Sequence, residues 1–341
     1  MERVIHDHRP LHDVPGDNSS HPATTPAAQT RVALIHNPRS HRNKGQAAAV
    51  EGLADLTIVQ PTTKAELARA LSRFREDGVE LLVISGGDGT VRDVLTIGHS
   101  IFGADWPVLA FLPQGKTNAL RIDLGLPKDW SLSDAIAAYA KGGRAHRQAL
   151  CVTGGEEPAD APMLGFVLGA GAFTLGIEAG QEAHRMGFFN SLAVAATAVM
   201  GVGQVLFSGN GNKWRRGTRM ELAFQPSGEP MPHSRHGTAD QRHIMLASTY
   251  RHLPGKMQLF GKDQGPIRLA ILDRPRRRIF AALPAILSGW HPGWLARAGL
   301  HHVSSAAFSL DVASPIILDG EQFPAGRYEI SLGPELEFVT A

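Results

Sequence analysis

The sequence predicts a two-domain protein in which an α/β domain precedes an antiparallel β domain. From Arg31 to Arg147, apolar strand-like runs alternate with helix-like segments, the pattern of βαβ units around a parallel sheet. After Arg147 the runs become short, β-type and separated by Gly and Pro. A chain of 341 residues with 43% hydrophobic content can bury the cores of two such domains.

The first domain is expected to contain an open sheet with helices packed against it. Its strand-like runs begin at Val32, Leu56, Leu81 and Val108, and the helix-like segments span Lys64 to Glu76 and Ser133 to Lys141. In the second domain, the strand-like runs are Phe166 to Leu168, Met220 to Phe224, His243 to Ser248 and Ile267 to Leu272.

A glycine turn, Gly86-Gly87-Asp88-Gly89-Thr90, follows the apolar run at Leu81 where a helix can begin. Glycines let backbone N–H groups and a helix N-terminus approach anionic oxygens closely, so this turn is typical of a phosphate site. Asp88 could reach a magnesium ion, and Thr90 could cap the helix or bind a phosphate. The alternative is a tight strand-to-helix turn with an Asp cap.

Two better-known nucleotide motifs are excluded. In GxGxxG the last glycine position falls at Arg92, and in a P-loop ending at Gly115-Lys116-Thr117 the first glycine position falls at Ala110. The sequence therefore supports neither a dinucleotide-binding motif nor a P-loop.

Other polar residues follow neighbouring strands of the expected sheet. Open α/β sheets bind ligands at the carboxyl edge of their strands, so these residues are expected to converge with the glycine turn on one nucleotide. They are Asn37, Thr62, Lys116, Thr117 and Asn118. Taken alone, Thr62 is predicted to be a helix cap rather than a ligand.

Four motifs in a fixed order resemble the diacylglycerol kinase catalytic family, which includes sphingosine kinases and bacterial lipid kinases. They are the Asn37-Pro38 loop, the glycine turn, the loop Gly115 to Asn118 and Asp319-Gly320-Glu321. The resemblance runs from about Arg31 to the C-terminus. It implies a doubly wound α/β nucleotide-binding domain followed by a β-sandwich whose last strand returns to the first domain.

We expect four segments on this basis. They are a disordered tail (1–30), an ATP-binding catalytic domain (31–147), a β-sandwich lipid-substrate domain (148–324) and a returning C-terminal strand (325–341).

The resemblance implies an ATP- and magnesium-dependent lipid kinase active in phospholipid metabolism. The acceptor would be the hydroxyl of a lipid such as diacylglycerol or a sphingoid base. The residues implied to bind ATP are Asn37, Thr62, Gly86, Gly87, Asp88, Gly89, Thr90, Asp93, Lys116, Thr117 and Asn118. Of these, Asp88 would hold the ATP-bound magnesium, directly or through water.

A lipid alcohol that attacks the γ-phosphate needs a carboxylate to accept its proton. We predict Asp319 as this general base, with Glu321 assisting. On an extended chain the two would share a face, although Gly320 can turn the backbone. The alternative for this motif is an Asp-Gly hairpin turn with an exposed Glu.

Several positions depart from the family pattern. His41 replaces a glycine of the first loop, Arg92-Asp93 replaces Asn-Glu after the glycine turn, and Lys116 replaces the threonine that contacts ATP. Asp93 keeps a carboxylate, and Lys116 could pair with a phosphate. Relatives often hold a structural magnesium in a loop of the second domain, where this chain has Arg268 at the side-chain position, and a guanidinium cannot ligate a cation.

Composition limits the partners and the compartment. A net charge of +2 with no nucleic-acid-binding motif argues against DNA or RNA, and the single Cys151 excludes internal disulfides and thiolate metal clusters. The N-terminus lacks a signal-peptide pattern, so we expect a cytoplasmic protein, with peripheral contact at the inner face of the membrane as an extension. A homodimer remains open.

Two apolar segments allow either membrane contact or burial. Gly187 to Phe207 carries no charge, and we favour a buried helix over a membrane span. The second is Ile279 to Ala298, where Trp290 and Trp294 follow four arginines at 274 and 276–278. It suits either a peripheral membrane contact or helices that cover the second domain.

Two other functions remain as alternatives to a lipid kinase. An enzyme of the NAD kinase type would share the first domain, but the late Asp-Gly-Glu motif and the Trp/Arg segment disfavour it. A catalytically inactive lipid-sensing module is suggested by Arg92 and Lys116, and ATP binding without turnover would identify it.

Overall fold

The computed structural model describes residues 30–38, 56–115, 117–155, 161–174, 217–262 and 265–341. The expected segments 1–30 and 187–207, and the residues His41 and Lys116, therefore lie wholly or almost wholly outside the described part of the chain.

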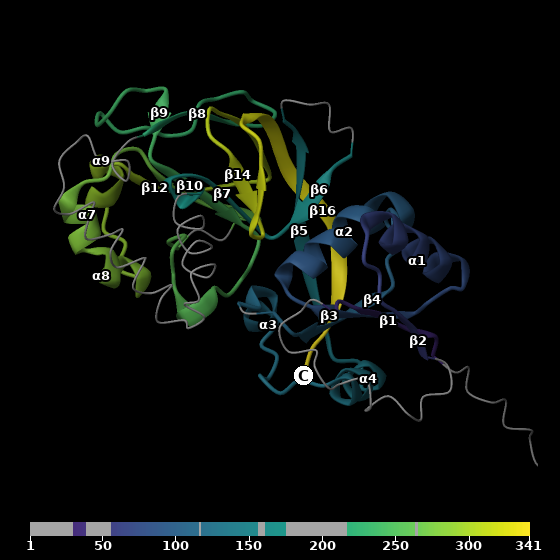
Figure 1. Cartoon of the computed structure of the whole chain (residues 1–341). Helices are drawn as coiled ribbons and strands as arrows, with labels where there is room; N and C mark the ends of the chain where they lie inside the picture. The colour runs from purple at the N-terminus through teal and green to yellow at the C-terminus, as the bar shows by residue number, and fades with distance from the viewer. Residues whose placement is uncertain (1–29, 39–55, 116, 156–160, 175–216, 263–264) are drawn as a thin grey trace, which may run out of the picture.

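In the first domain a parallel sheet lies between helices. Its elements are β1 (Val32–His36), β2 (Leu56–Val59), α1 (Lys64–Glu76), β3 (Leu81–Gly86), α2 (Asp88–Phe102), β4 (Val108–Pro113), α3 (Ala119–Asp123) and α4 (Leu132–Ala140). The four strands pair in the order β2-β1-β3-β4, with α1 and α2 on one face and α3 and α4 on the other (Figure 1). This arrangement confirms the doubly wound α/β fold.

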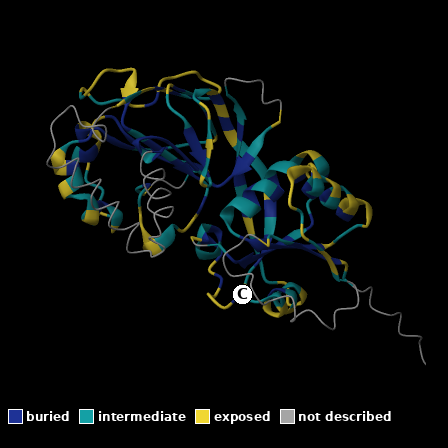
Figure 2. Ribbon diagram, in the orientation of Figure 1, coloured by how far each residue is buried: buried dark blue, intermediate teal, exposed yellow. Residues whose placement is uncertain are grey.

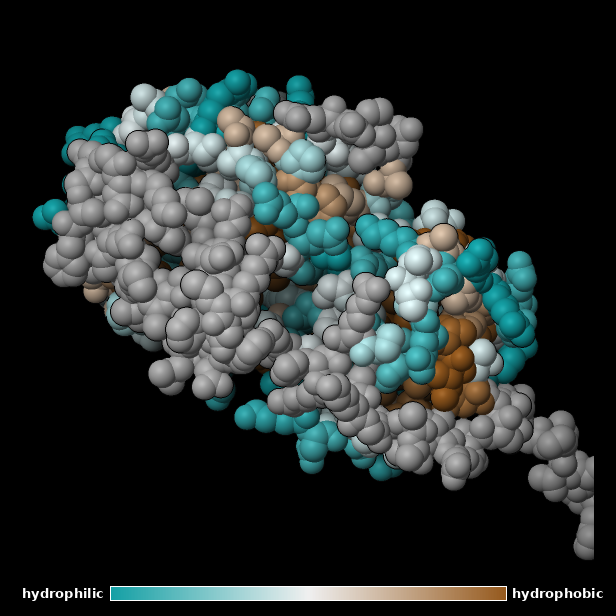
Figure 3. All heavy atoms as spheres, viewed as in Figure 1, coloured by the Kyte–Doolittle hydropathy of each residue, from teal (hydrophilic) through white to brown (hydrophobic). Residues whose placement is uncertain are grey.

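Burial explains why β3 lies at the centre of this sheet. All six residues of β3 are buried, and Leu81 to Ile84 are 0% exposed, as expected for a parallel strand covered on both faces. On one face, Leu67, Leu71 and Phe74 give α1 its buried side, while β2 is the edge strand (Figure 2). Ile58 of β2 is 45% exposed, and hydrophobic atoms reach the surface at this edge (Figure 3).

The second domain consists of antiparallel strands with short helices at its far end. Its elements are β5 (Arg144–Gly154), β6 (Met163–Gly165), β7 (Val167–Gly171), β8 (Thr218–Phe224), β9 (Gln241–Arg242), β10 (Ile244–Ser248), the 3₁₀ helix η3 (Pro254–Lys256), β11 (Ile267–Leu272), α7 (Arg277–Ala281), α8 (Leu283–Leu287), α9 (Trp294–Ala298), β12 (Leu300–Ser305), β13 (Ala307–Val312), β14 (Ile316–Leu318), β15 (Glu321–Phe323) and β16 (Gly326–Val339).

These strands form two layers. A six-stranded sheet, β12-β11-β10-β7-β14-β15, shares a buried core with β5, β8, β13 and β16, to which Leu150, Met220, Ile271, Phe308 and Ile330 contribute. The second domain is therefore the β-sandwich implied by the resemblance. The short helices α7, α8 and α9 bury Ile279, Ile286 and Leu295 in a smaller cluster with Leu272 and Leu300, while Trp290 remains 50% exposed.

One strand belongs to both domains. The first residues of β16, Gly326 to Ser331, pair with β13 of the sandwich, and near its end Phe338 pairs in parallel with Leu109 of β4. From Tyr328 to Val339, with an irregularity between Leu332 and Glu335, β16 also pairs with β5. The parallel sheet of the first domain thus continues into one layer of the sandwich (Figure 1).

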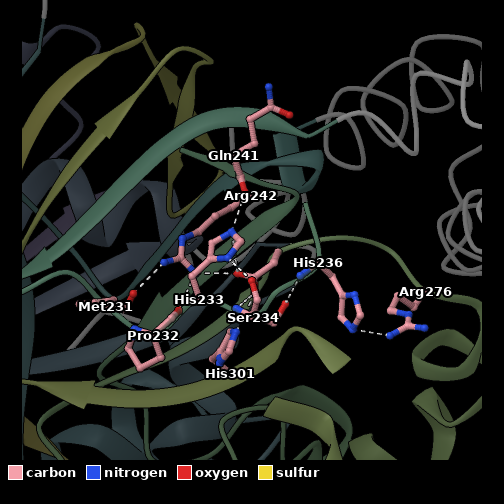
Figure 4. Close-up of polar contacts among 10 residues, drawn as sticks. Met231, Pro232, His233, Ser234, His236, Gln241, Arg242, Arg276 and His301 are labelled. Carbon is pink, nitrogen blue, oxygen red and sulfur yellow. Dashed lines mark hydrogen bonds and ion pairs between the residues drawn. The ribbon is translucent and has the colours of Figure 1, made fainter. Parts of the chain in front are cut away.

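A buried charge network holds the outer loop of the sandwich (Figure 4). Asp273, directly after β11, accepts hydrogen bonds from Arg242 (2.7 Å), the Ser234 backbone (2.7 Å) and His301 (2.8 Å). Burial opposes ionisation of Asp273, but the bonds from His301 and Ser234 outweigh it and lower the pKa of this carboxyl. Arg242 also donates to the carbonyls of Met231 and Pro232. The network therefore fixes this loop against β9, the end of β11 and β12.

Candidate active site

Two glycine turns meet at the carboxyl edge of the parallel sheet. A Cβ added at Gly115 would lie 2.6 Å from the Cα of Gly87, and one added at Gly87 would lie 3.1 Å from the Cα of Gly115. Only glycines allow this approach, which brings the loop after β4 onto the turn after β3. The backbone of Gly86 and Gln114 joins the two turns through an N–H···O bond of 2.7 Å.

The Asn-Pro loop joins the same edge. Asn37 Nδ2 donates to Thr90 Oγ1 over 2.8 Å, and its backbone N–H donates to the carbonyl of Ser85. Thr90 lies in the first turn of α2, whose N-cap is Gly87. A pocket of about 260 Å³ opens here, and its lining includes Asn37, Thr62, Thr90 and Asp93. Four residues predicted from separate motifs therefore line one pocket.

Three further residues line this pocket that the sequence did not single out as ligands. Lys64 begins α1 and Thr63 caps it by accepting a hydrogen bond from the Glu66 backbone (3.1 Å). Thr63 rather than Thr62 is therefore the helix cap, and Thr62 donates its hydroxyl to Glu66 (2.9 Å). His36, at the end of β1, is partly desolvated, which lowers its pKa. The signal in the sequence that could have identified Thr63 and Lys64 was the adjacent pair Thr62-Thr63 followed by a lysine.

Asp88 has a structural role that the motif alone did not indicate. Its carboxylate accepts hydrogen bonds from the backbone N–H groups of Ala119 (3.0 Å) and Leu120 (3.2 Å), which begin α3. Burial raises the pKa of Asp88, while these N–H groups oppose the shift. Asp88 therefore anchors the loop that follows β4 to the glycine turn.

In the loop Gly115 to Asn118, the side chain of the asparagine holds the loop closed. Asn118 is buried, adopts φ +49°, and exchanges two hydrogen bonds with the backbone of Gly115 (2.8 and 2.7 Å). Thr117 is exposed beside it, and Lys116 lies outside the described residues. Asn118 thus fixes the glycine pair, and Thr117 is the loop side chain that faces solvent.

Asp319 lies in a hairpin turn between β14 and β15. Both central residues have positive φ, +44° at Asp319 and +86° at Gly320, as a type I′ turn requires. The hairpin alternative is therefore correct in geometry, and Asp319 and Glu321 do not share the face of an extended strand. The turn directs the Asp319 carboxylate inward, where it accepts bonds from the backbone N–H groups of Phe166 and Val167, both at 2.9 Å.

The environment of Asp319 suits a general base. Burial raises its pKa to about 7; the charge of Asp88 adds to the rise, while the N–H groups of Phe166 and Val167 and the charge of Arg92 oppose it. A carboxyl group that titrates near neutral pH can both accept and release a proton under physiological conditions. The two turns are linked through Arg92 of α2, which lies 3.5 Å from the carbonyl of Leu318 and pairs with Glu321 on either side of the Asp-Gly turn.

Arg92 links the two domains at this point. Its buried guanidinium pairs with Asp93 (2.8 Å) and forms an ion pair with Glu321. Glu321 therefore neutralises an arginine of α2, and its predicted assisting role remains a prediction. Arg92 occupies one of the positions at which this chain departs from the family pattern.

Several residues that support Asp319 could not be found from the sequence. A Cβ at Gly165 would lie 2.8 Å from Asp319 Oδ2, so only glycine leaves room for the carboxylate. Tyr250 is 1% exposed and stacks on Phe166 with ring centroids 5.0 Å apart. Burial and the charges of Asp319, Asp88 and Asp123 raise the pKa of Tyr250 well above its usual range. The phenol therefore lies within the field of three carboxylates.

The glycine pair provides a test of the site. Gly115→Ala should lower the affinity for ATP about tenfold or more, because the new methyl group would push the two turns apart. Gly293→Ala, at the N-cap of α9 in the second domain, is the matched control, since a Cβ there meets no atom within 4 Å. Calorimetric titration with Mg-ATP measures both, and equal losses in the two variants would contradict the packing role of Gly115.

The sequence predicted that the structural magnesium site of relatives is either missing here or replaced by the charge of Arg268. Among the described residues, no group of three or more His, Cys, Asp and Glu side chains is placed to hold a metal ion. The loop residues Asp263 and Gln264 lie outside the described part of the chain. Arg268 is in β11, and its guanidinium carbon lies 5.3 Å from the centre of the Phe260 ring.

The fold and this site define a class of protein. It has an α/β domain with a glycine turn and a β-sandwich whose acidic turn lies beside the first helix after that glycine turn. Residues 31–151 match the family model described as the diacylglycerol kinase catalytic domain. The resemblance drawn from the four motifs is therefore confirmed for the first domain and the start of β5.

Comparisons with individual proteins agree with the family match. The chain is 37% identical over 79 residues to Probable lipid kinase YegS of Shigella flexneri and of Escherichia coli (strain K12 / DH10B). The matched segment is 23% of this chain and 26% of each relative. A crystal structure of a diacylglycerol kinase from Bacillus anthracis str. Sterne superposes with a TM-score of 0.60 over 92% of this chain and 98% of that one, at 15% identity. That likeness shows the fold.

Proposed function

We propose that the protein is a lipid kinase that transfers the γ-phosphate of ATP to the hydroxyl of a lipid such as diacylglycerol or a sphingoid base. The match to the diacylglycerol kinase catalytic domain supports a kinase, and the lipid kinases named above support a lipid acceptor. The single observation that carries the proposal is the position of Asp319, a carboxyl group with a pKa of about 7 held within the influence of Asp88.

The residues at the glycine turns fit a magnesium-bound triphosphate. The close approach of Gly87 and Gly115 places the backbone of both turns at this edge, and the pocket beside them is lined by the Asn37 amide, the Lys64 ammonium and Thr62. Asp88 and Asp93 are the carboxylates that would hold magnesium, directly or through water. When bound, ATP supplies the phosphoryl group and magnesium neutralises its charge.

The residues of this chain then perform four tasks. The glycine turns and Asn37 orient the phosphates, and Asp88 keeps the loop before α3 in place. Arg92 joins α2 to Glu321, the residue after the Asp-Gly turn, through an ion pair. Asp319, held by the N–H groups of Phe166 and Val167, accepts the proton of the lipid hydroxyl as it attacks.

We place the lipid-facing surface on the sandwich and extend it to a peripheral membrane contact through α7 to α9. Trp290 is half-exposed, its ring lies 6.0 Å from that of Trp294, and the Arg278 guanidinium lies 5.2 Å from the Trp294 ring. Arginines beside interfacial tryptophans attract anionic headgroups. Among the described residues, no helix is both long and apolar enough to cross a bilayer.

Transfer of labelled phosphate from ATP tests the proposal across a panel of acceptors. We expect labelled product with a diacylglycerol or a sphingoid base presented in anionic vesicles, and none with NAD. Labelled NAD instead would support the NAD kinase alternative. Binding of ATP without transfer to any acceptor would support the inactive module, for which the Arg92–Glu321 pair is the specific observation.

A further inference from the structure

A second and larger pocket lies away from the glycine turns. It has a volume of about 610 Å³ and opens between the start of β5, the segment after β10 and the start of β11, with Glu335 of β16 at its rim. It shares no lining residue with the pocket beside the glycine turns. The residues that matter for its chemistry are Arg147, Thr249, Arg251, His252, Arg268 and Glu335.

The lining of this pocket is strongly cationic. Three arginines and the imidazoles of His146 and His252 face a single carboxylate, Glu335, among the described lining residues. Arg147 is already paired with the buried Asp123. Arg251 is exposed and makes no ion pair in the described part of the chain, so its charge is available to a ligand.

A buried hydroxyl adds a directional donor. The Thr249 side-chain oxygen is shielded from solvent and has no hydrogen-bond partner among the described residues. A buried polar group that lacks a partner costs stability, and such groups in native proteins commonly bind a ligand or an ordered water. Thr249 also lines the pocket, so a rotation of its side chain would let the hydroxyl donate to an oxygen atom of a bound anion.

Residues that line this pocket also bind the segments that support Asp88 and Asp319. His252 and Arg147 bind Asp123, the last residue of α3, through the His252 backbone N–H (2.8 Å) and an Arg147 bond to the Asp123 carbonyl (2.9 Å). The first residues of α3 donate to Asp88. On the other wall, the backbone N–H of Thr249 donates to the carbonyl of Phe166, whose own N–H holds Asp319.

We propose that this pocket is a binding site for a phosphate-bearing anion, either a small phosphate monoester or the headgroup of a phospholipid. Arginine forks, imidazoles and a hydroxyl are all donors to phosphate oxygens, and an arginine binds them in pairs. The site does not depend on the proposed kinase activity, because it shares no lining residue with the pocket beside the glycine turns. Its position gives a bound anion contact with the supports of both Asp88 and Asp319.

Thermal unfolding with inorganic phosphate is the first test, with chloride at matched ionic strength as reference. We expect a saturable rise in the melting temperature of the full chain. Arg251→Gln should weaken phosphate affinity about tenfold, the usual effect of losing a charge-assisted bond. Thr249→Val should raise the melting temperature without phosphate, because it removes the unsatisfied hydroxyl, and should reduce the phosphate-induced rise.

Two controls distinguish this pocket from other basic surfaces and from the glycine turns. Arg277→Gln removes an exposed arginine from α7, and Thr90→Val alters the nucleotide pocket; both should keep the wild-type response to phosphate. A response that Thr90→Val abolishes and Arg251→Gln leaves intact would overturn the proposal.

Sedimentation with phosphatidylcholine vesicles, with and without phosphatidic acid, separates the two sources of phosphate. Weaker binding of Arg251→Gln to the phosphatidic acid vesicles alone would assign the site to a lipid headgroup. A defect with inorganic phosphate alone would assign it to a small phosphate monoester. If the wild-type protein responds to neither, or if both pocket variants respond as the wild type does, the pocket is not an anion site.

Discussion

Asp319→Asn is expected to lower the rate of phosphoryl transfer by about a hundredfold or more, the usual contribution of a general base. The amide can occupy the same hairpin turn but cannot accept the proton of the lipid hydroxyl. Affinity for ATP should remain near the wild-type value, because Asp319 lies on the sandwich side of the site. Initial rates with labelled ATP and calorimetric titration with Mg-ATP measure the two quantities.

The control for this variant is Asp311→Asn, which makes the same change at a partly exposed position of β13. It should leave the rate unchanged. Weaker ATP binding with an unchanged rate in Asp319→Asn would place Asp319 with the nucleotide and remove it from the role of base.

The same residue predicts how activity depends on pH. With a pKa of about 7, Asp319 gains its reactive carboxylate form as the pH rises through neutrality, so the rate should rise between about pH 6 and pH 8. The stability of the folded protein is expected to change with pH in the opposite direction to the rate. Because the folded-state pKa lies above the ordinary value of 3.8, the folded protein binds the proton more tightly, and the stability that this provides is lost as the pH rises through about 7.

Asp88→Ala is expected to lower phosphoryl transfer by about a hundredfold or more and to weaken ATP binding as well. The structure gives two reasons, the loss of a carboxylate for magnesium and the release of the N–H groups of Ala119 and Leu120. The second loss resembles the removal of a helix cap and should cost about 1 kcal/mol of unfolding free energy. Denaturant titration measures it beside the rates.

Asp88→Asn separates the two reasons, because an amide oxygen can still accept one of the N–H bonds but binds magnesium poorly. It should recover much of the stability and little of the activity. Asp105→Ala, an exposed position after α2, is the control for a simple loss of charge. Normal turnover in a folded Asp88→Ala protein would exclude the nucleotide site that we propose.

Much of the fold could be predicted because its signals are local. The helix expected over 64–76 coincides with α1, and the run 267–272 coincides with β11. The polar ends of successive strands indicated which edge of the sheet would carry the site, and Asn37, Thr90 and Asp93 do line one pocket there.

The remaining features depend on contacts between distant segments, which leave no local pattern. Gly165 and Phe166 matter because Asp319 packs against them from 154 and 153 residues away along the chain, and Arg92 pairs with a carboxylate on the other domain. Residue type alone also could not separate a turn from a base at Asp319. The structure shows that the turn is what directs the carboxylate inward.

The strand shared by the two domains has a consequence for how the protein is made. Ribosomes release the N-terminal segment first, and most first domains can complete their sheet before the next domain is synthesised. Here the strand that pairs with β4 is β16, which ends at Val339. The sheet of the first domain therefore cannot be completed until β16 has been synthesised. Until then β4 exposes an edge that can pair with other chains. The nascent protein should therefore depend on chaperones until β16 has been synthesised, because only then can the sheet of the first domain be completed.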